Sequence, residues 1–458
     1  MKVLLINPLS TSSFITPPLG LLYLAASLKK AGHEPEILDL MLEKLGPEEV
    51  LAKISLEVRV IGIPAVTPLI QSAVSLANLI RKRFPEKIII LGGSHPSLLP
   101  EETLANSPCV DFIIKGEGEE RINLLIGYLD GRRKEEELDG IVFRKNGKII
   151  DLPVKKYVTN LDELPFPARE LISVKKYSDF LESRQKPATT MITSRGCPFN
   201  CIYCSKPIFG NVCRLRSPEN VLAEIEQLKE KYGIKEIIFY DDTFTLNRER
   251  VLKICNLLID KKMDIKWKCE TRVNLIDEEL LGKMKEAGCY LVAFGVESGN
   301  QRILNILKKG ITLEQVKKAV ESAKKVGIET LGYFMIGVPG ETEKEIDETI
   351  DFAKDLDLDF AQFSIATAFP GTELYQIARS QNKLPKDWSN SFYALGKEPN
   401  VSLCGVSIEK LSEYSKKAYR SFYLRPNFIF KKIKKIKSFG DLTFYFQGLK
   451  NLFGIFKN

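Results

Sequence analysis

The feature that most constrains this chain is an alternation of strand and helix patterns that runs through it twice. In the first 150 residues, buried-strand runs such as Lys2–Asn7 alternate with helix patterns such as Pro18–Ala31. The alternation resumes near Ala188 and gives six further strand-like runs. Strands that alternate with helices pair in parallel and carry helices on their faces. We therefore expect an α/β protein with two sheet-containing domains.

The first domain is predicted over residues 1–140 as a doubly wound, Rossmann-like sheet. Its strands are predicted at Lys2–Asn7, His33–Leu40, Arg59–Ala65, Lys87–Leu91 and Asp111–Lys115. Such sheets bind ligands at the carboxyl ends of their strands. Residues 141–187 are predicted as a hairpin, turning at Asn146-Gly147, and a proline-rich linker.

The second domain is predicted over residues 188–385 as a partial (β/α)6 barrel, open or closed. Its strands are predicted at Thr189–Thr193, Glu236–Tyr240, Lys266–Glu270, Tyr290–Val296, Thr330–Ile336 and Phe360–Ala366. Consecutive βα units without a break form parallel sheets of this kind. Residues 386–458 are predicted to be a mainly helical, basic C-terminal region.

Composition limits the setting and the partners of the protein. The nine cysteines among 458 residues are scattered and odd in number, which does not indicate a disulfide framework and favours a cytoplasmic location. The uncharged stretch Val60–Ile80 contains Gly62, Pro64 and Pro68, and we expect a strand and an amphipathic helix there rather than a membrane span. The net charge of +8 is concentrated after Arg425, so a nucleic-acid-binding surface is not indicated.

Three cysteines stand close together directly after the first predicted barrel strand. They form the sequence Cys197-x3-Cys201-x2-Cys204. Thiolates at this spacing can converge on one metal centre from a single loop. A zinc site with Cys213 as fourth ligand is an alternative, although His33 and His95, the only histidines, are far away in the sequence.

This motif, with an aromatic residue before its last cysteine, resembles that of the radical-SAM superfamily. The resemblance implies that the three cysteines hold a four-iron (4Fe-4S) cluster whose fourth iron binds S-adenosylmethionine (SAM). Further family-like motifs follow in order at Tyr240–Phe244, Phe294–Gly299, Met335–Glu341 and Phe369–Leu374. They imply SAM contacts at Tyr203, Asp241, Asp242, Glu297, Ser298, Ile336 and Gly337. Arg195 and Arg272 could meet the carboxylate of SAM, or be exposed or salt-bridged.

A doubly wound domain before such a barrel resembles the cobalamin-binding subgroup of this superfamily. The turns that would face the corrinoid imply contacts at Pro18, Gly20, Gly93, Ser94, His95, Gly116 and Glu117. The Asp-x-His-x-x-Gly motif with which other cobalamin domains ligate cobalt is missing. His95 is therefore a candidate lower ligand, and a purely structural histidine is the alternative.

The tail from Arg425 carries eight Lys or Arg against one Asp. Its basic residues interleave with Phe428, Ile429, Ile433 and Ile436. This pattern suits peripheral contact with an anionic membrane surface. A solvated basic helix that packs an apolar stripe on the barrel is the alternative.

The resemblance implies a cobalamin-dependent radical-SAM enzyme, in the first place a C-methyltransferase. One SAM would methylate the corrinoid, and a second would give the 5′-deoxyadenosyl radical that abstracts hydrogen from an unactivated carbon of a small-molecule or lipid-like substrate. An electron donor such as flavodoxin or ferredoxin would reduce the cluster. A cyclase or rearrangement enzyme with the same cofactors is the alternative within this class. A non-catalytic iron–sulfur or zinc protein with a regulatory role is the alternative from another class.

Overall fold

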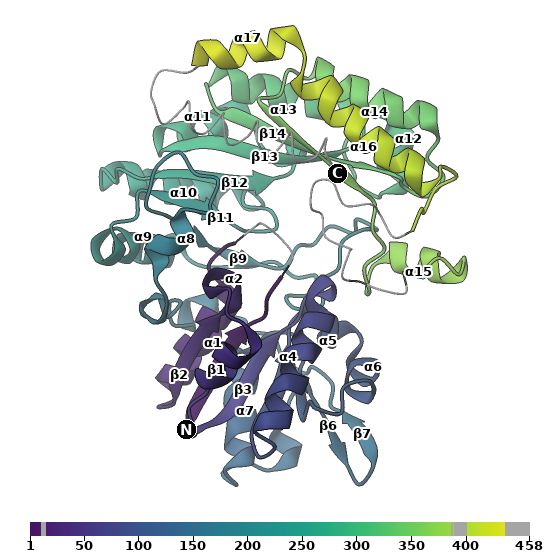
Figure 1. Ribbon diagram of the computed structural model, residues 1–458. Coiled ribbons are helices and arrows are strands. Elements are labelled where there is room, and N and C mark those ends of the chain that lie inside the picture. Colours follow the sequence, from purple (N-terminus) through teal and green to yellow (C-terminus); the bar gives the residue numbers. More distant parts are fainter. Residues whose placement is uncertain (11–14, 386–387, 389–400, 436–458) are drawn as a thin grey trace. The chain divides into compact units, whose positions relative to one another are not determined.

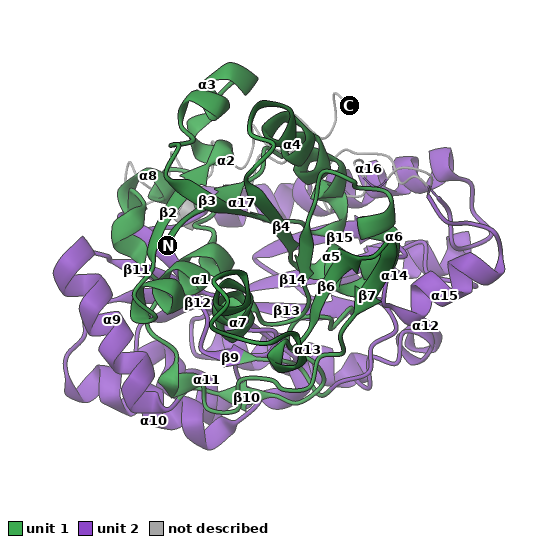
Figure 2. Ribbon diagram, turned by 90° about the horizontal axis from the view of Figure 1, so that it is seen from below, with its two compact units in different colours: residues 1–181, 195–198, 205–216 green, residues 182–194, 199–204, 217–458 purple. Residues whose placement is uncertain are grey.

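The computed structural model describes residues 1–10, 15–385, 388 and 401–435. The chain forms two compact units, coloured separately in Figure 2. Unit 1 comprises residues 1–181, 195–198 and 205–216, and unit 2 comprises residues 182–194, 199–204 and 217–458. The chain thus passes between the units several times around the three cysteines.

Unit 1 contains a seven-stranded sheet in the order β2-β1-β3-β4-β5-β6-β7; Figure 1 labels β1, β2, β3, β6 and β7. Its parallel strands are β1 (Lys2–Asn7), β2 (Glu34–Asp39), β3 (Val58–Pro64), β4 (Ile88–Gly92) and β5 (Phe112–Ile114). The order reverses between β1 and β3, which confirms the doubly wound arrangement and puts the expected ligand edge at the carboxyl ends of these strands. The predicted hairpin, β6 (Ile141–Lys145) and β7 (Lys148–Asp151), continues the sheet in antiparallel pairing.

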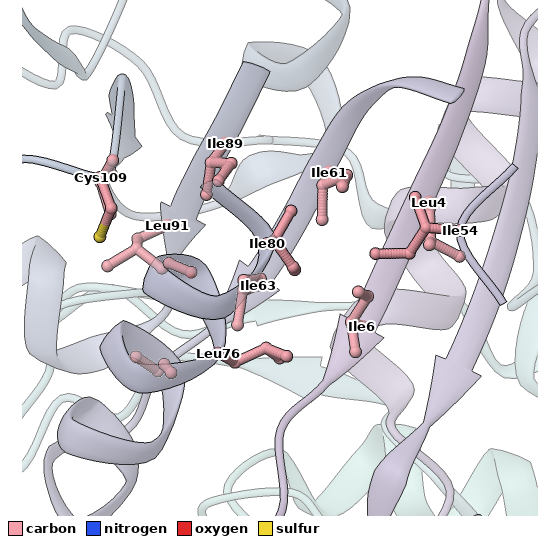
Figure 3. Close-up of a cluster of buried hydrophobic side chains, with 14 of the residues drawn as sticks. Leu4, Ile6, Ile54, Ile61, Ile63, Leu76, Ile80, Ile89, Leu91 and Cys109 are labelled. Atoms are coloured by element: carbon pink, nitrogen blue, oxygen red, sulfur yellow. The ribbon is translucent and has the colours of Figure 1, made fainter. Parts of the chain in front are cut away.

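Helices connect the parallel strands and cover the sheet with apolar side chains. The helices of unit 1 are α1 (Leu19–Lys30), α2 (Leu40–Glu43), α3 (Pro47–Ala52), α4 (Ile70–Arg83), α5 (Ser94–Leu98), α6 (Pro100–Ala105), α7 (Gly118–Leu129) and α8 (Val174–Ser178). Leu76 and Ile80 of α4 pack with Ile61, Ile63 and Ile89 of the sheet (Figure 3). The uncharged stretch after Val60 is therefore a buried strand followed by an amphipathic helix, as predicted.

Unit 2 contains a six-stranded parallel sheet in the order β15-β14-β13-β12-β11-β8. Its strands are β8 (Ala188–Met191), β11 (Glu236–Phe239), β12 (Lys266–Thr271), β13 (Cys289–Glu297), β14 (Glu329–Ile336) and β15 (Phe360–Ile365). Each strand of this sheet pairs with the next strand of the same sheet along the chain, which confirms the predicted run of βα units. The cysteine loop follows β8, so it leaves the sheet at the carboxyl edge, where this fold places its chemistry.

The helices of unit 2 lie between and after these strands. They are α9 (Pro218–Tyr232), α10 (Arg248–Asp260), α11 (Glu278–Glu286), α12 (Gln301–Ile306), α13 (Leu313–Lys325), α14 (Glu343–Asp355), α15 (Glu373–Ser380), α16 (Ile408–Tyr423) and α17 (Pro426–Lys435). Tyr419 and Tyr423 of α16 hydrogen-bond the backbone of β15, at the edge of the sheet. No helix in the described part of the chain is long and apolar enough to cross a membrane.

The described start of the basic tail packs on unit 2. Phe428 contacts Phe422 and Tyr423, and Lys432 pairs with Asp359 at 3.0 Å. Large apolar side chains on the other side of α17, among them Ile433, are exposed. Residues 436–458, to which the rest of the membrane prediction refers, lie outside the described residues.

Candidate active site

The cysteine loop is shared between the two units. Residues 195–198, with Cys197, group with unit 1, whereas residues 199–204, with Cys201 and Cys204, group with unit 2. None of the nine cysteines forms a disulfide. Within the described ranges, no three His, Cys, Asp or Glu side chains are arranged to hold a metal ion. The assignment of these three thiols to one cluster therefore stays a prediction from their spacing.

Cys201 lies in a strongly cationic environment. The Nη1 atom of Arg272 is 3.6 Å from its sulfur, and the guanidinium of Arg272 stacks on Phe199 with 3.8 Å to the ring centroid. A hydrogen bond from Cys204, together with the charges of Lys309 and Arg272, holds the pKa of Cys201 well below its usual value. Only a thiolate ligates iron, and the charges of Lys309 and Arg272 favour the thiolate form of Cys201.

Main-chain hydrogen bonds hold the cysteine loop on unit 2. The N–H of Ile202 donates to the carbonyl of Leu307 at 3.1 Å, and its carbonyl accepts from the N–H of Leu374 at 3.1 Å. Leu307 follows α12, and Leu374 lies in the first turn of α15. These bonds place the segment between Cys201 and Cys204 against the predicted motif Phe369–Leu374.

A buried ion pair lies beside this loop, at the end of β13. Lys309 Nζ is 2.7 Å from Glu297 Oε1, and Tyr203 Oη donates to the same oxygen at 2.8 Å. Glu297 and Lys309 are each less than a tenth exposed, and Glu297 has a φ of +69°, which is rare outside glycine. The structure thus brings together two predicted SAM contacts, Tyr203 and Glu297.

The two aspartates after β11 have different environments. Asp241 is buried, and its carboxylate accepts hydrogen bonds from the backbone and hydroxyl groups of Thr193 and Ser194. Burial raises its pKa. Asp242 is exposed. Because the side chain of Asp241 ties β11 to the segment before the cysteines, only its backbone is available for the predicted SAM contact.

The later predicted contacts are also buried. Ser298 Oγ lies 3.0 Å from the hydroxyl of Thr349 on α14, so this side chain holds the turn after β13. Ile336 is fully buried, and Gly337 has a φ of +81°. The N–H of Gly337 donates to Glu341 Oε2 at 2.6 Å. These residues all lie at the carboxyl ends of strands in unit 2, as the sequence predicted.

The predicted cobalamin contacts of unit 1 lie at or near the turns that follow its strands. Gly93 follows β4 with a φ of +97°, and a Cβ atom there would lie 2.9 Å from the carbonyl oxygen of Ala65. Ser94 begins α5, and Gly116 follows β5 with a φ of +65°. Pro18 and Gly20 flank the start of α1, and Gly20 is exposed. The glycine at position 93 is required by the close approach of the Ala65 backbone, and contact of these turns with a corrinoid stays a prediction.

His95 and Glu117 are the two buried polar side chains in this predicted set. His95 Nδ1 lies 3.3 Å from the hydroxyl of Thr67, and burial lowers the pKa of the imidazole to about 4. A neutral imidazole is the form that ligates metals. The structure is therefore compatible with His95 as the lower cobalt ligand and with His95 as a purely structural residue. The carboxylate of Glu117 is bound by Arg195 and Arg214.

Sequence reasoning missed Lys309, Glu119 and Arg214. Lys309 stands in an ordinary Lys-Lys-Gly sequence, and nothing in its spacing indicated a buried partner for Glu297. For Arg195 and Arg272, the sequence left open whether they meet the carboxylate of SAM or form salt bridges. Arg195 is salt-bridged within unit 1, and Arg272 lies beside the sulfur of Cys201.

Comparisons with known proteins match two parts of the chain. The model of the radical SAM superfamily matches residues 191–353, and the model of the B12 binding domain matches residues 8–126. The chain is 38% identical to an uncharacterised methyltransferase of Pyrococcus horikoshii, over 98% of this chain and 99% of that protein. It is 31% identical to the anaerobic magnesium-protoporphyrin IX monomethyl ester cyclase of Rubrivivax gelatinosus, over 82% of this chain and 70% of the cyclase.

A solved structure shares the fold. The radical S-adenosylmethionine methyltransferase TsrM from Kitasatospora setae, with cobalamin and a [4Fe-4S] cluster bound, has a TM-score of 0.69 at 20% identity. The alignment covers 82% of this chain and 78% of TsrM. From the two family models and the near full-length relative we conclude that this chain belongs to the cobalamin-binding radical SAM enzymes, with a 4Fe-4S cluster, S-adenosylmethionine and cobalamin as its cofactors.

Proposed function

We propose that this enzyme is a C-methyltransferase that acts on an unactivated carbon of a small molecule. The observation that carries the proposal is its similarity over nearly the whole length of both chains to the methyltransferase of Pyrococcus horikoshii. When bound, the cofactors supply a methyl donor and a radical that abstracts hydrogen. The protein's task is to hold and orient them and to exclude water.

In this proposal, the cluster is held by Cys197, Cys201 and Cys204. The cations Arg272 and Lys309 favour the thiolate of Cys201. They also suit the carboxylate of SAM, because a buried anion needs a partner of opposite charge. The backbone at Asp241 and Gly337, and the side chains of the Tyr203–Glu297 pair, would complete the SAM site. These assignments are proposals from position and charge.

The cobalamin site is proposed at the carboxyl edge of the unit 1 sheet. Its contacts would be Pro18, Gly20, Gly93, Ser94, His95, Gly116 and Glu117. A corrinoid spectrum that survives gel filtration tests the site as a whole. A His95→Ala variant whose cobalt spectrum equals that of the wild type would exclude His95 as the lower ligand.

Isotope labelling tests methyl transfer. The enzyme is reconstituted anaerobically with iron, sulfide and cobalamin, reduced, and incubated with methyl-labelled SAM and a small-molecule extract of cells that lack it. A methyltransferase should form 5′-deoxyadenosine, S-adenosylhomocysteine and a product that carries the label. The related cyclases suggest the second candidate. A cyclase would form 5′-deoxyadenosine and an unlabelled product.

The same experiment separates enzyme from regulator. A fully loaded, reduced cluster that never cleaves SAM would contradict any radical enzyme. An electron donor is needed in the cell to reduce the cluster, and flavodoxin or ferredoxin stays the prediction.

We further infer a peripheral membrane contact through α17, where Ile429, Phe430 and Ile433 are exposed. Sedimentation with anionic lipid vesicles, compared with neutral ones, tests it.

A further inference from the structure

Arg195 stands two residues before the first cluster cysteine and is held by two carboxylates of unit 1. Its Nη1 atom is 2.8 Å from Glu117 Oε1, and its Nη2 atom is 2.5 Å from Glu119 Oε1. All three side chains are less than a tenth exposed. The glutamates lie at the start of α7, in the turn that follows β5 and carries the predicted cobalamin contact Gly116.

The partners of Arg195 are themselves fixed. Glu117 Oε2 accepts from Arg214 Nη1 at 2.7 Å and from the N–H of Val158 at 2.9 Å. The guanidinium of Arg195 lies over the rings of Tyr23 and Phe209, with 5.0 and 5.1 Å to the ring centroids. Two arginines and two glutamates thus form a charge-balanced network inside unit 1.

Such a network is a poor way to stabilise a fold. Desolvation of buried charges can exceed the attraction between them, and well-packed apolar residues of similar volume are often as good or better. The best-attested use of buried ionic groups is to select one register of the chain. The register selected here is that of the segment before Cys197.

The backbone after Arg195 is also held in place. Gly196 has a φ of +88°, and a Cβ atom there would lie 2.4 Å from the carbonyl oxygen of Val212 and 3.1 Å from that of Phe209. The loop that contains Phe209 and Val212 leads into β10 (Arg214–Leu215), which pairs with β9 (Ser194–Arg195). Side chain and backbone therefore restrain the same short segment from two directions.

We propose that Arg195, Glu117, Glu119 and Arg214 are positioning residues that set the place of Cys197 and thereby tune the cluster. The inference rests on the proposed role of Cys197 as a ligand. Both carboxylate oxygens of Glu117 are bound within this network, which leaves its backbone for the predicted cobalamin contact. The turn after β5 and the first cluster ligand then belong to one connected set of interactions.

Two conservative variants of the whole chain test the proposal. Glu119→Gln keeps the shape of the side chain and removes its charge. Arg195→Lys keeps the charge but loses the planar fork that reaches both glutamates. The matched control is Asp111→Asn in the same unit, because Asp111 Oδ2 binds Arg81 at 2.5 Å and the N–H of Ile89 at 2.8 Å. Each protein is reconstituted anaerobically with iron and sulfide.

Three properties are measured without substrate: thermal unfolding of the apoprotein, the rate of iron loss to a chelator, and the electron paramagnetic resonance spectrum of the reduced cluster. We expect both network variants to lose iron about 10 to 100 times faster than the wild type and to show shifted g-values. Asp111→Asn should match the wild type in both cluster properties. Unfolding data identify any variant that is not folded, and the other variant then decides.

The proposal is overturned if the network variants keep the wild-type spectrum and rate, or if Asp111→Asn loses iron equally fast. In the second case the effect would come from general destabilisation of unit 1. A wild-type protein that takes up no cluster would instead refute the proposed function. If the wild type transfers the methyl group while the network variants keep the wild-type spectrum and rate of iron loss, this inference alone is refuted.

Discussion

Replacing Glu341 by glutamine should make unit 2 more stable at neutral pH. This carboxyl is 2% exposed in the turn between β14 and α14. Its Oε2 accepts from the N–H groups of Gly337 at 2.6 Å and Val338 at 3.0 Å, and its Oε1 has no hydrogen-bond partner among the described residues. Burial raises the pKa of Glu341 from 4.5 to about 7. Ionisation is therefore unfavourable in the folded state.

Because the pKa of Glu341 is raised on folding, the sign of the pH dependence of stability is determined. A carboxyl whose pKa is raised on folding contributes stability that is fully present below pH 4.5 and is lost as the pH rises through about 7. The difference between these pKa values corresponds to about 3 kcal/mol at most. Glutamine keeps an acceptor for Gly337 and carries no charge. Glu341→Gln should thus be close to neutral at pH 4.5 and gain up to about 3 kcal/mol above pH 8.

Urea unfolding of the apoprotein at several pH values measures this effect. Trp267 is buried in unit 2, so its fluorescence reports on the correct unit. The matched control is Glu345→Gln, four residues further on, because Arg302 lowers the pKa of Glu345 to about 2. That variant should be destabilised at pH 7 and approach the wild type as the pH falls from 4.5 towards 2. A Glu341→Gln gain that is equal at pH 5 and pH 8 would refute the reasoning.

Three further outcomes are expected. Gly196→Ala should lower both iron content and melting temperature, because its Cβ would meet a carbonyl oxygen at 2.4 Å. The control Gly233→Ala has open space around it, so it should cost about 1–2 kcal/mol in urea unfolding and leave iron content unchanged. Lys309→Met should destabilise unit 2 by about 3–5 kcal/mol in urea unfolding by leaving Glu297 unpaired, and adding Glu297→Gln should restore much of the loss. Cys204→Ala should retain the fold by circular dichroism but form no 5′-deoxyadenosine; formation at the wild-type rate would remove Cys204 from the cluster.

The strands could be predicted from sequence because each is a short, bounded run of buried residues. β1 lies at the predicted residues Lys2–Asn7, and most other predicted strands differ from the structure by one or two residues at an end. The hairpin turn was also predictable, since Asn146 and Gly147 both adopt positive φ. Local sequence determines these features.

Short helices and buried ion pairs could not be predicted in this way. The sequence of α5 contains His95 and Pro96 and shows no helical period. Glu117 and Arg195 are 78 positions apart, and their pairing depends on the tertiary fold that brings these two segments together. A single sequence holds no signal for such distant side-chain pairs, whereas the cofactor motifs are contiguous and were visible.

The pattern of β12 leads to a last expectation, about the substrate. Parallel strands covered on both faces are usually apolar throughout, but Lys266–Thr271 alternates between partly exposed polar residues and buried ones. Trp267 donates to the carbonyl of Ala287, beside α11, so Lys268 and Glu270 face the opposite side, and Glu270 accepts from Tyr333 at 2.8 Å. A hydrocarbon substrate on that face would remove the remaining water from these partly exposed groups and offer them no hydrogen bond in return. Label from methyl-labelled SAM should therefore enter the polar fraction of a cell extract, and label confined to apolar lipids would contradict this expectation.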